Sequence, residues 1–202
     1  MRSGFYLQSC VAGVLCALLL LSGSSGPASG ADAKPLSAIL IVARDDLPDS
    51  SFAHSIVLVM NNLGPGPIGI IINRPMPIPV SRLFPDIERL AQVRDKVYFG
   101  GPVEFGSVWF LFRAATRPEH AIKACDGVFL SADRELLVQL LARNKPMDSL
   151  RIFLGHASWA PGQLEVEIER HDWTSKRAEM EAIFNGKSKY PWPSPQDPTH
   201  SI

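Results

Sequence analysis

Two residues of this chain have side chains suited to nucleophilic chemistry, His156 and Ser158, which are two positions apart. A histidine base that activates a serine would indicate a hydrolase, but an acid must orient that base. The candidate acids, none of them singled out by spacing, are Asp49, Asp126 and Glu165. In the nucleophile turn of α/β-hydrolases glycines flank the serine, whereas Ala157 and Trp159 flank Ser158. A hydrolase-like enzyme using Ser158 and His156 therefore stays an alternative, and we predict no catalytic residue.

Asn73-Arg74-Pro75 and Gly100-Gly101 suggest a different chemistry, the binding of an anion. Pro75 holds Arg74 in an extended conformation, and a guanidinium fork suits carboxylate or phosphate. Two adjacent glycines expose backbone to close approach, so these turns could form a concave anion site. The alternative is that Asn73 closes a turn, Arg74 pairs with a carboxylate of the acidic strand face that Glu165 and Glu167 would form, and the glycines only let strands pack.

We expect a third turn, which follows His156, to face the same cleft. Trp159 precedes Pro161-Gly162 and would either cover this turn or stack on a ligand. The candidate ligand-binding residues are Asn73, Arg74, Gly100, Gly101, His156, Ser158, Trp159, Gln163 and Glu165.

Other site classes are disfavoured by spacing and charge. The five histidines show no H-x₃-H spacing and no cysteine pair accompanies them, so we predict no metal site and no cofactor. The glycines from Gly64 to Gly69 match a dinucleotide pattern, but a β-branched run follows where a helix should begin. A formal net charge of zero disfavours nucleic acid as a partner. The expected partner is an unidentified small anion or protein.

The first 33 residues have the pattern of a secretory signal peptide. A basic start is followed by a short apolar run, Cys10–Leu21, and by small residues that end in Ala31-Asp32-Ala33. This pattern is typical of export signals, and the run is shorter than the roughly 20 residues of a membrane span. A buried helix or an uncleaved anchor is the alternative. We therefore predict a periplasmic or secreted protein without a membrane span after cleavage, with Cys125 as its single remaining cysteine and no internal disulfide.

Apolar runs and turn residues predict one α+β or mixed α/β domain over residues 34–186. The expected sheet is largely antiparallel, with two to four helices and a flexible Pro-rich tail at 187–202. The predicted strands are 37–43, 55–60, 68–73, 96–100, 107–112, 127–130, 150–154 and 163–169, with residues 104–106 as a connection. The predicted helices are a short one within 81–91, one over 132–143 capped by Ser131, and a last one from Thr174 or Ser175 to Phe184. Pro75, Pro77 and Pro79 are predicted to exclude regular structure up to Val80.

Three segments in order carry a family resemblance: Gly69–Pro75, Phe99–Val103 and His156–Glu165. Together they resemble the YqgE/AlgH family (UPF0301, DUF179) over most of the chain after the signal. The resemblance implies a single α/β domain and the label of a transcriptional regulator, and the family has no settled reaction. Three features depart from the family: its members are usually cytoplasmic, they usually have tyrosine in place of His156, and the Pro-rich tail is peculiar to this chain. We therefore expect a non-catalytic binding or regulatory module, with assembly through a sheet edge as a further alternative.

Overall fold

The computed structural model describes residues 38–61, 63–178 and 183–184. Of the two units of the chain, Met1–Ala33 and Lys34–Ile202, all described residues belong to the second, which is described by itself. The predicted signal peptide 1–33 and the predicted tail 187–202 lie outside the described residues. Both therefore stay predictions.

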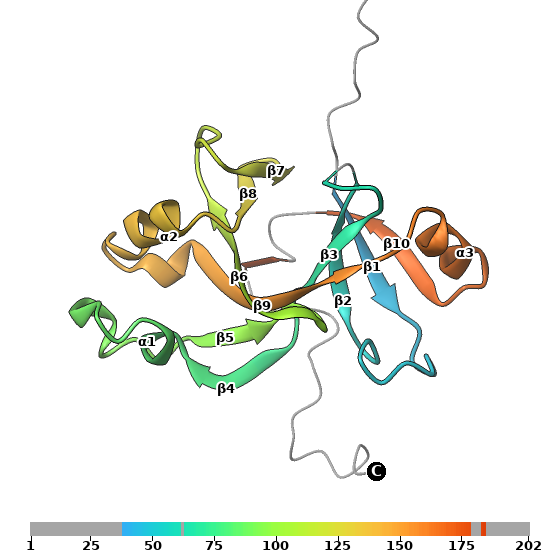
Figure 1. Cartoon of the computed structure of the whole chain (residues 1–202), viewed down its shortest axis with the longest axis horizontal. Coiled ribbons are helices and arrows are strands. Elements are labelled where there is room, and N and C mark those ends of the chain that lie inside the picture. The colour runs from blue at the N-terminus through green and yellow to red at the C-terminus, as the bar shows by residue number, and fades with distance from the viewer. Residues whose placement is uncertain (1–37, 62, 179–182, 185–202) are drawn as a thin grey trace, which may run out of the picture. The chain divides into compact units, whose positions relative to one another are not determined.

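The described residues form a single domain around a curled, largely antiparallel sheet of ten strands (Figure 1). The strands are β1 (Ile39–Ala43), β2 (Ile56–Met60), β3 (Ile68–Ile71), β4 (Pro75–Pro79), β5 (Lys96–Phe99), β6 (Val103–Arg113), β7 (Ile122–Cys125), β8 (Val128–Ser131), β9 (Leu150–Ser158) and β10 (Trp173–Arg177). Their order is β10-β1-β2-β3-β9-β6-β8-β7, with β5 parallel to β9 and β4 beside β5. The predicted fold class is confirmed.

Three short α-helices accompany the sheet within the described residues: α1 (Val80–Leu83), α2 (Arg134–Leu141) and α3 (Gln163–Glu169). Two 3-10 turns, Glu88–Leu90 and Pro146–Asp148, add to them. The predicted cap of α2 was wrong. Asp133 caps this helix by accepting from the Leu136 N–H at 2.8 Å, whereas the Ser131 hydroxyl accepts from the Asp133 N–H at 3.1 Å.

The first three strands are apolar on both faces because both faces are buried. Ile41, Val57 and Ile71 belong to the core cluster that also holds Trp159, Leu164 and Trp173. The alternate residues of the same strands, including Leu40, Leu58 and Ile70, pack in a second cluster that reaches Phe153 of β9 and Phe184. The β1–β3 strands therefore support α3 and the start of β10 from one face.

The predicted strand at Gln163–Glu169 is wrong, because this segment is the helix α3. Its alternating apolar residues include Leu164 and Ile168, which are four residues apart and so lie on one face of a helix as well. Both pack in the core cluster that α3 covers, while Val166 between them is 51% exposed. Three apolar residues in a segment of this length cannot distinguish the period of 2 of a strand from the period of 3.6 of a helix.

The predicted last helix is wrong at its start, because Trp173–Arg177 is strand β10, antiparallel to β1. Trp173 is 4% exposed and lies opposite Ala43. Burial of this indole beside the apolar β1 outweighs the capping potential of Thr174 and Ser175. Ile183 and Phe184 are helical, and the rest of the predicted helix lies outside the described residues, Ala178 excepted.

The expectation that prolines exclude regular structure over Pro75–Pro79 is also wrong, because these residues form β4. The Phe99 N–H donates to the Arg74 carbonyl, and the Val80 N–H donates to the Asp95 carbonyl. Because the direction of the backbone groups alternates along a strand, the backbone nitrogens of Pro75 and Pro79 point away from β5. Their missing N–H groups therefore remove no hydrogen bond between the two strands. Two further elements differ from the prediction. Residues 104–106, predicted as a connection, lie inside β6, whose pairing with β9 is irregular between Val103 and Val108. Strand β7 was not predicted.

Candidate functional site

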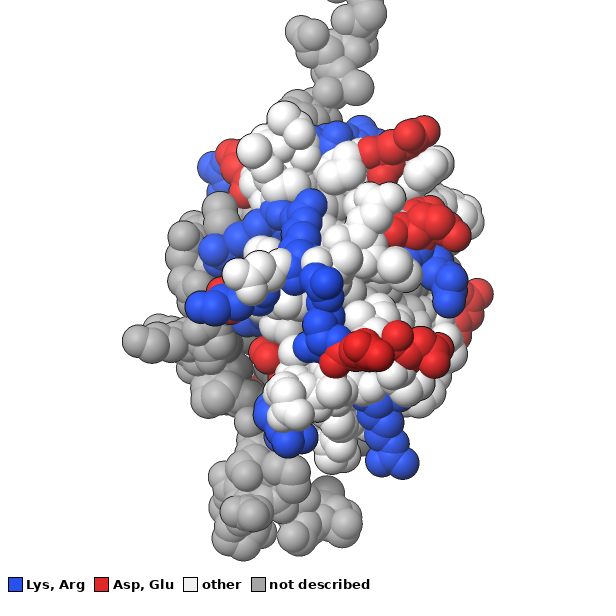
Figure 2. All heavy atoms as spheres, turned by 90° about the vertical axis from the view of Figure 1, so that its left-hand side faces the viewer, with Lys and Arg blue, Asp and Glu red and all other residues white. Residues whose placement is uncertain are grey.

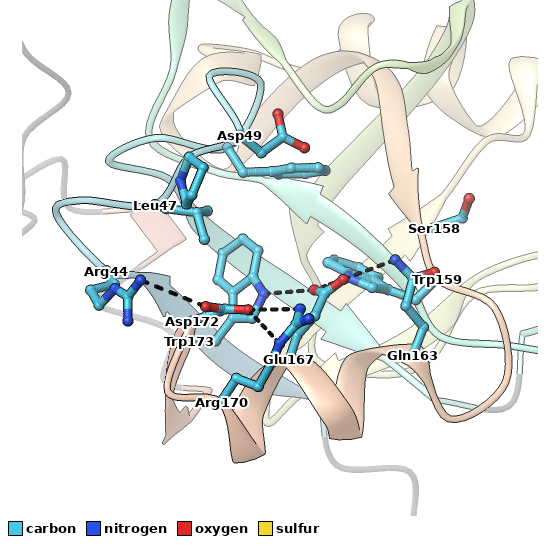
Figure 3. Close-up of a pocket in the computed structure, with 12 residues that line it drawn as sticks. Arg44, Leu47, Asp49, Ser158, Trp159, Gln163, Glu167, Arg170, Asp172 and Trp173 are labelled. Atoms are coloured by element: carbon cyan, nitrogen blue, oxygen red, sulfur yellow. Dashed lines mark hydrogen bonds and ion pairs between the residues drawn. The ribbon is translucent and has the colours of Figure 1, made fainter.

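A pocket of about 450 Å³ opens between the segment that follows β1 and the segment from α3 to β10 (Figure 3). One wall consists of Leu47, Pro48, Asp49 and Phe52, and Ser158 and Trp159 come from the end of β9 and just after it. The opposite side is formed by residues of α3 and the turn after it, Gln163, Glu167, Arg170, Asp172 and Trp173, with Arg44 beside them. We call this recess the tryptophan pocket.

Three aromatic rings in mutual contact form the floor of the tryptophan pocket. Phe52 stacks on Trp159 with ring centroids 6.0 Å apart, and Trp173 meets both rings edge-on at 5.7 and 6.1 Å. Trp159 is only 5% exposed and Trp173 only 4%. This packing makes the floor of the pocket apolar.

One carboxylate holds the floor in place (Figure 3). The indole N–H groups of Trp159 and Trp173 both donate to Oε2 of Glu167 at 2.9 Å. The other oxygen, Oε1, accepts from Nε2 of Gln163 at 2.8 Å. Both buried donors are thereby satisfied, as buried indoles require.

The charged groups at the rim neutralise one another. Asp172 accepts from Arg170 at 2.9 Å and lies 3.8 Å from Arg44, which also pairs with Asp46. The lining contains two guanidiniums, Arg44 and Arg170, and three carboxylates, Asp49, Glu167 and Asp172. The lining is therefore not basic, although it offers both donors and acceptors.

Three of the nine candidate residues, Ser158, Trp159 and Gln163, lie at this pocket. The Ser158 hydroxyl points away from the pocket in Figure 3, and Gln163 also accepts from the Ala160 N–H at 3.0 Å. The sequence interpretation missed Arg44, Phe52, Glu167 and Trp173 as lining residues. The signal that could have pointed to this pocket was Trp173, since ligand pockets are often lined by aromatic side chains.

Asn73 and Arg74 instead support the turn before β2. Asn73 Oδ1 accepts from the Ile56 N–H at 2.8 Å, and its Nδ2 donates to the His54 carbonyl at 2.9 Å. The Arg74 guanidinium lies 5.0 Å from the centroid of the Phe99 ring and donates to the Ala53 carbonyl at 3.5 Å. Burial lowers the pKa of Arg74 to about 10. These contacts agree with the structural alternative for Asn73.

Gly100 and Gly101 allow β5 to approach β9. A Cβ on Gly100 would lie 2.3 Å from the Gly155 carbonyl oxygen, and one on Gly101 would lie 2.2 Å from the His156 carbonyl. Gly101 also has a φ of +153°, which side chains rarely adopt. The backbone at this place faces another strand, in agreement with the packing alternative.

His156 and Glu165 lie apart from the tryptophan pocket. His156 is 7% exposed and packs against Trp109 at 5.6 Å, and its buried Nδ1 has no hydrogen-bond partner in the described structure. Glu165 lines a second recess of about 340 Å³ beside residues 64–67. The nine candidate residues thus do not share one cleft.

Neither a candidate membrane span nor a candidate metal cluster occurs in the part of the chain that the structure describes. None of the helices in this part of the chain is long and apolar enough to cross a membrane. The same residues contain no group of three or more His, Cys, Asp or Glu side chains that could hold a metal ion.

Comparison with known proteins places this fold in a family. The family model described as AlgH-like (DUF179) matches residues 39–195. A UPF0301 protein of Alcanivorax borkumensis is 32% identical over 162 residues, which cover 78% of this chain and 86% of that protein. A UPF0301 protein of Pelodictyon phaeoclathratiforme is 31% identical over 154 residues, with 76% and 81% covered.

Two solved structures share the fold. The solution structure of the AlgH protein from Pseudomonas aeruginosa matches with a TM-score of 0.60 and 24% identity, over 76% of this chain and 82% of that one. A crystal structure of a Corynebacterium diphtheriae protein matches with a TM-score of 0.60 and 24% identity, over 75% and 80%. The chain therefore belongs to the AlgH-like family of UPF0301 proteins.

Proposed function

We propose that this protein is an exported, non-catalytic binding module whose tryptophan pocket takes an apolar side chain of a peptide. The observation that carries the proposal is the floor of Phe52, Trp159 and Trp173, held by Glu167 at the base of an open recess. Ligand sites are typically concave, with an apolar lining and a few fixed polar groups.

The charges of the lining favour a peptide over a small anion. Three carboxylates against two guanidiniums give the lining an excess of one negative charge, and Asp172 already pairs with Arg44 and Arg170. A peptide brings amide donors for Asp49 and amide acceptors for Gln163 and the arginines. Its side chain would contact Leu47, Pro48 and Phe52.

The surroundings of His156 favour binding over hydrolysis. A general base needs an acid partner on its second nitrogen, but Nδ1 of His156 is buried and has no hydrogen-bond partner in the described structure. The imidazole packs against Trp109, and Ser158 points away from the pocket. We therefore assign Ser158 no nucleophilic role.

The first 33 residues support export, because the basic start, the apolar run and the small-residue exit form a secretory pattern. An exported protein would not act directly on transcription. The charge distribution adds to this argument: the net charge is zero, and on the side of the domain that carries α1 and α2 basic groups adjoin acidic ones (Figure 2).

Binding is tested with capped tripeptides that carry leucine, phenylalanine or serine at the centre. The readout is the indole N–H signals in ¹⁵N NMR spectra. We expect the leucine and phenylalanine peptides to shift the signals of Trp159 and Trp173 and leave that of Trp109 in place. If all three peptides leave all indole signals unchanged at millimolar concentration, the proposed function is wrong.

A matched pair of variants locates the binding. Leu47→Arg puts a charge on the apolar wall and should weaken peptide binding at least about tenfold, as loss of a buried anchor contact does. Val166→Arg puts the same charge on the exposed face of α3 and should leave binding unchanged. Equal effects of the two variants would contradict binding in the tryptophan pocket.

Export is tested by mass spectrometry of the N-terminus of protein taken from fractionated cells. We expect a periplasmic or extracellular protein that begins just after the Ala31-Asp32-Ala33 segment. A cytoplasmic protein that retains Met1 would contradict export and leave the binding proposal standing.

A further inference from the structure

We propose that the apolar residue bound by the tryptophan pocket is the first residue of its chain, and that its α-ammonium group pairs with Asp49. This inference rests on the proposed peptide binding and adds which part of the peptide is recognised. Three features support it: the charges of the lining, the position of Asp49 and the size of the pocket.

Both guanidinium groups that line the tryptophan pocket already have carboxylate partners. Arg170 pairs with Asp172, with the nitrogen and the oxygen 2.9 Å apart. Arg44 pairs with Asp46 at 2.5 Å, and its guanidinium lies 3.8 Å from Asp172. Neither group can therefore bind an anionic ligand without giving up an existing ion pair.

Two carboxylates of the lining, Asp49 and Glu167, form no ion pair within the described part of the chain. Glu167 accepts only from neutral donors, the two indoles and the Gln163 amide. Oδ1 of Asp49 accepts from the Ser51 N–H at 2.8 Å. The uncompensated charge of the pocket is therefore negative, and a complementary ligand carries a positive group.

Asp49 lies at the rim of the pocket, beside its apolar wall. It is exposed, and it follows Leu47 and Pro48, which belong to the same wall. In Figure 3 it lies on the side of the recess opposite Glu167 and Arg170. A cation that pairs with Asp49 is therefore close to the wall that contacts the apolar side chain.

The size of the pocket favours a cation and an apolar group in one residue. Its volume of about 450 Å³ is near the lower end of the roughly 300–1,000 Å³ of small-ligand sites, which suits one large residue better than a length of peptide. An α-ammonium group is bonded to the same Cα as the apolar side chain, whereas a lysine ammonium lies on a flexible stem whose ordering weakens binding. Capture of an N-terminal amine is a recurring mode of peptide recognition.

The probes are three tripeptide amides: Leu-Ala-Ala with a free amine, the same peptide acetylated, and acetylated Leu-Lys-Ala. Binding is measured from the indole N–H signals of Trp159 and Trp173 near about pH 6.5, where an α-amino group is protonated. The free-amine peptide should bind about fivefold more tightly than its acetylated form, because acetylation removes the ion pair. The lysine peptide should bind like the acetylated peptide.

The pH dependence identifies the ammonium group. An α-amino group ordinarily has a pKa of about 8, and the advantage of the free-amine peptide should disappear as the pH rises through this value and the amine loses its charge. The described lining contains no histidine and no lysine, and carboxylates and guanidiniums ordinarily titrate far from this range. The charged groups of the lining are Arg44, Asp49, Glu167, Arg170 and Asp172. The acetylated peptide should therefore bind equally well from about pH 6.5 to about pH 9.

A matched pair of variants tests the carboxylate. Asp49→Asn removes the charge but keeps the side-chain oxygen that accepts from the Ser51 N–H, so it should fold and reduce the preference for the free amine to less than about twofold. Asp45→Asn removes the same charge from an exposed residue of the same loop that does not line the pocket, and should keep the preference. If Asp49→Asn does not fold, acetylation and the pH series still decide.

The outcomes separate the two proposals. If the free-amine and acetylated peptides bind equally, or if the preference persists in Asp49→Asn, recognition of the first residue is wrong and the pocket proposal stands. A lysine peptide that binds as tightly as the free-amine peptide would also overturn the assignment to the first residue. If no peptide, acetylated or free, shifts the Trp159 and Trp173 signals, both proposals are wrong.

Discussion

At the scale of single residues, Glu167 organises the site. Its two oxygens accept hydrogen bonds from Trp159, Trp173 and Gln163. The sequence led to Trp159 and Gln163 as site residues but not to Glu167, which looked like one member of an acidic strand face. A carboxylate that binds two distant indoles has no local pattern, because the contact depends on a helix and a strand meeting in space.

Glu167→Ala should lower the free energy of unfolding by about 2 kcal/mol, since it leaves two buried indole donors without an acceptor. Chemical denaturation followed by circular dichroism measures this change. Glu169→Ala, two residues further along α3 and exposed, is the control and should change stability by less than about 0.5 kcal/mol. Equal effects of the two substitutions would show that the indole contacts do not matter for stability.

A second residue, Asp126, gives a pH-dependent prediction. A hydrogen bond from Lys123 and the charges of Lys123 and Arg177 hold the pKa of Asp126 below its ordinary value of 3.8. Because the lowered pKa belongs to the folded state, the pair stabilises the fold above the ordinary pKa, and this contribution disappears as the pH falls through the lowered value. Lys123→Ala should raise the pKa of Asp126 in a carboxyl NMR titration, whereas Lys123→Arg should keep it low. An unchanged pKa in Lys123→Ala would exclude Lys123 as the cause.

At the scale of elements, strands that are buried on both faces were predictable from their apolar runs. These include β1, β2 and β3, and the Leu-rich helix α2 was predictable as well. The wrong predictions concern segments whose secondary structure depends on contacts with residues distant in sequence. Segment 163–169 fits either period, β10 forms because Trp173 packs beside β1, and β4 forms because Pro75 and Pro79 turn outward. These contacts are made with residues distant in sequence, so a local pattern could not predict them.

Gly101→Ala tests the close approach of β5 to β9. The new Cβ would collide with the His156 carbonyl, and the positive φ is unfavourable for alanine, so the free energy of unfolding should fall by about 3 kcal/mol. Gly64→Ala is the control, because a Cβ at that glycine meets nothing within 4 Å. Thermal unfolding of both variants measures the difference. A Gly101→Ala protein as stable as the wild type would contradict the close approach of Gly101 to His156.

At the scale of the whole molecule, the predicted fold class and family are confirmed, whereas the residues predicted to share one cleft lie in separate places. The three family segments do meet around β3, β5 and β9, where Gly69 lies opposite Ala157 and Gly100 bonds to Leu154. Their contacts with one another are packing contacts. Only the third segment also lines the recess, with Ser158, Trp159 and Gln163, and the segment after β1 and the residues after α3 complete it. Family motifs therefore mark the framework of this domain, and the less conspicuous Arg44, Phe52 and Trp173 line its pocket.

The central claim is that the tryptophan pocket receives an apolar peptide side chain. The most direct measurement is the set of intermolecular nuclear Overhauser effects between the leucine methyl groups of the bound leucine tripeptide and the aromatic protons of the protein. The account predicts contacts with Phe52, Trp159 and Trp173 and none with Trp109. Contacts with Trp109 instead, or no contact with any of the three pocket rings, would contradict it.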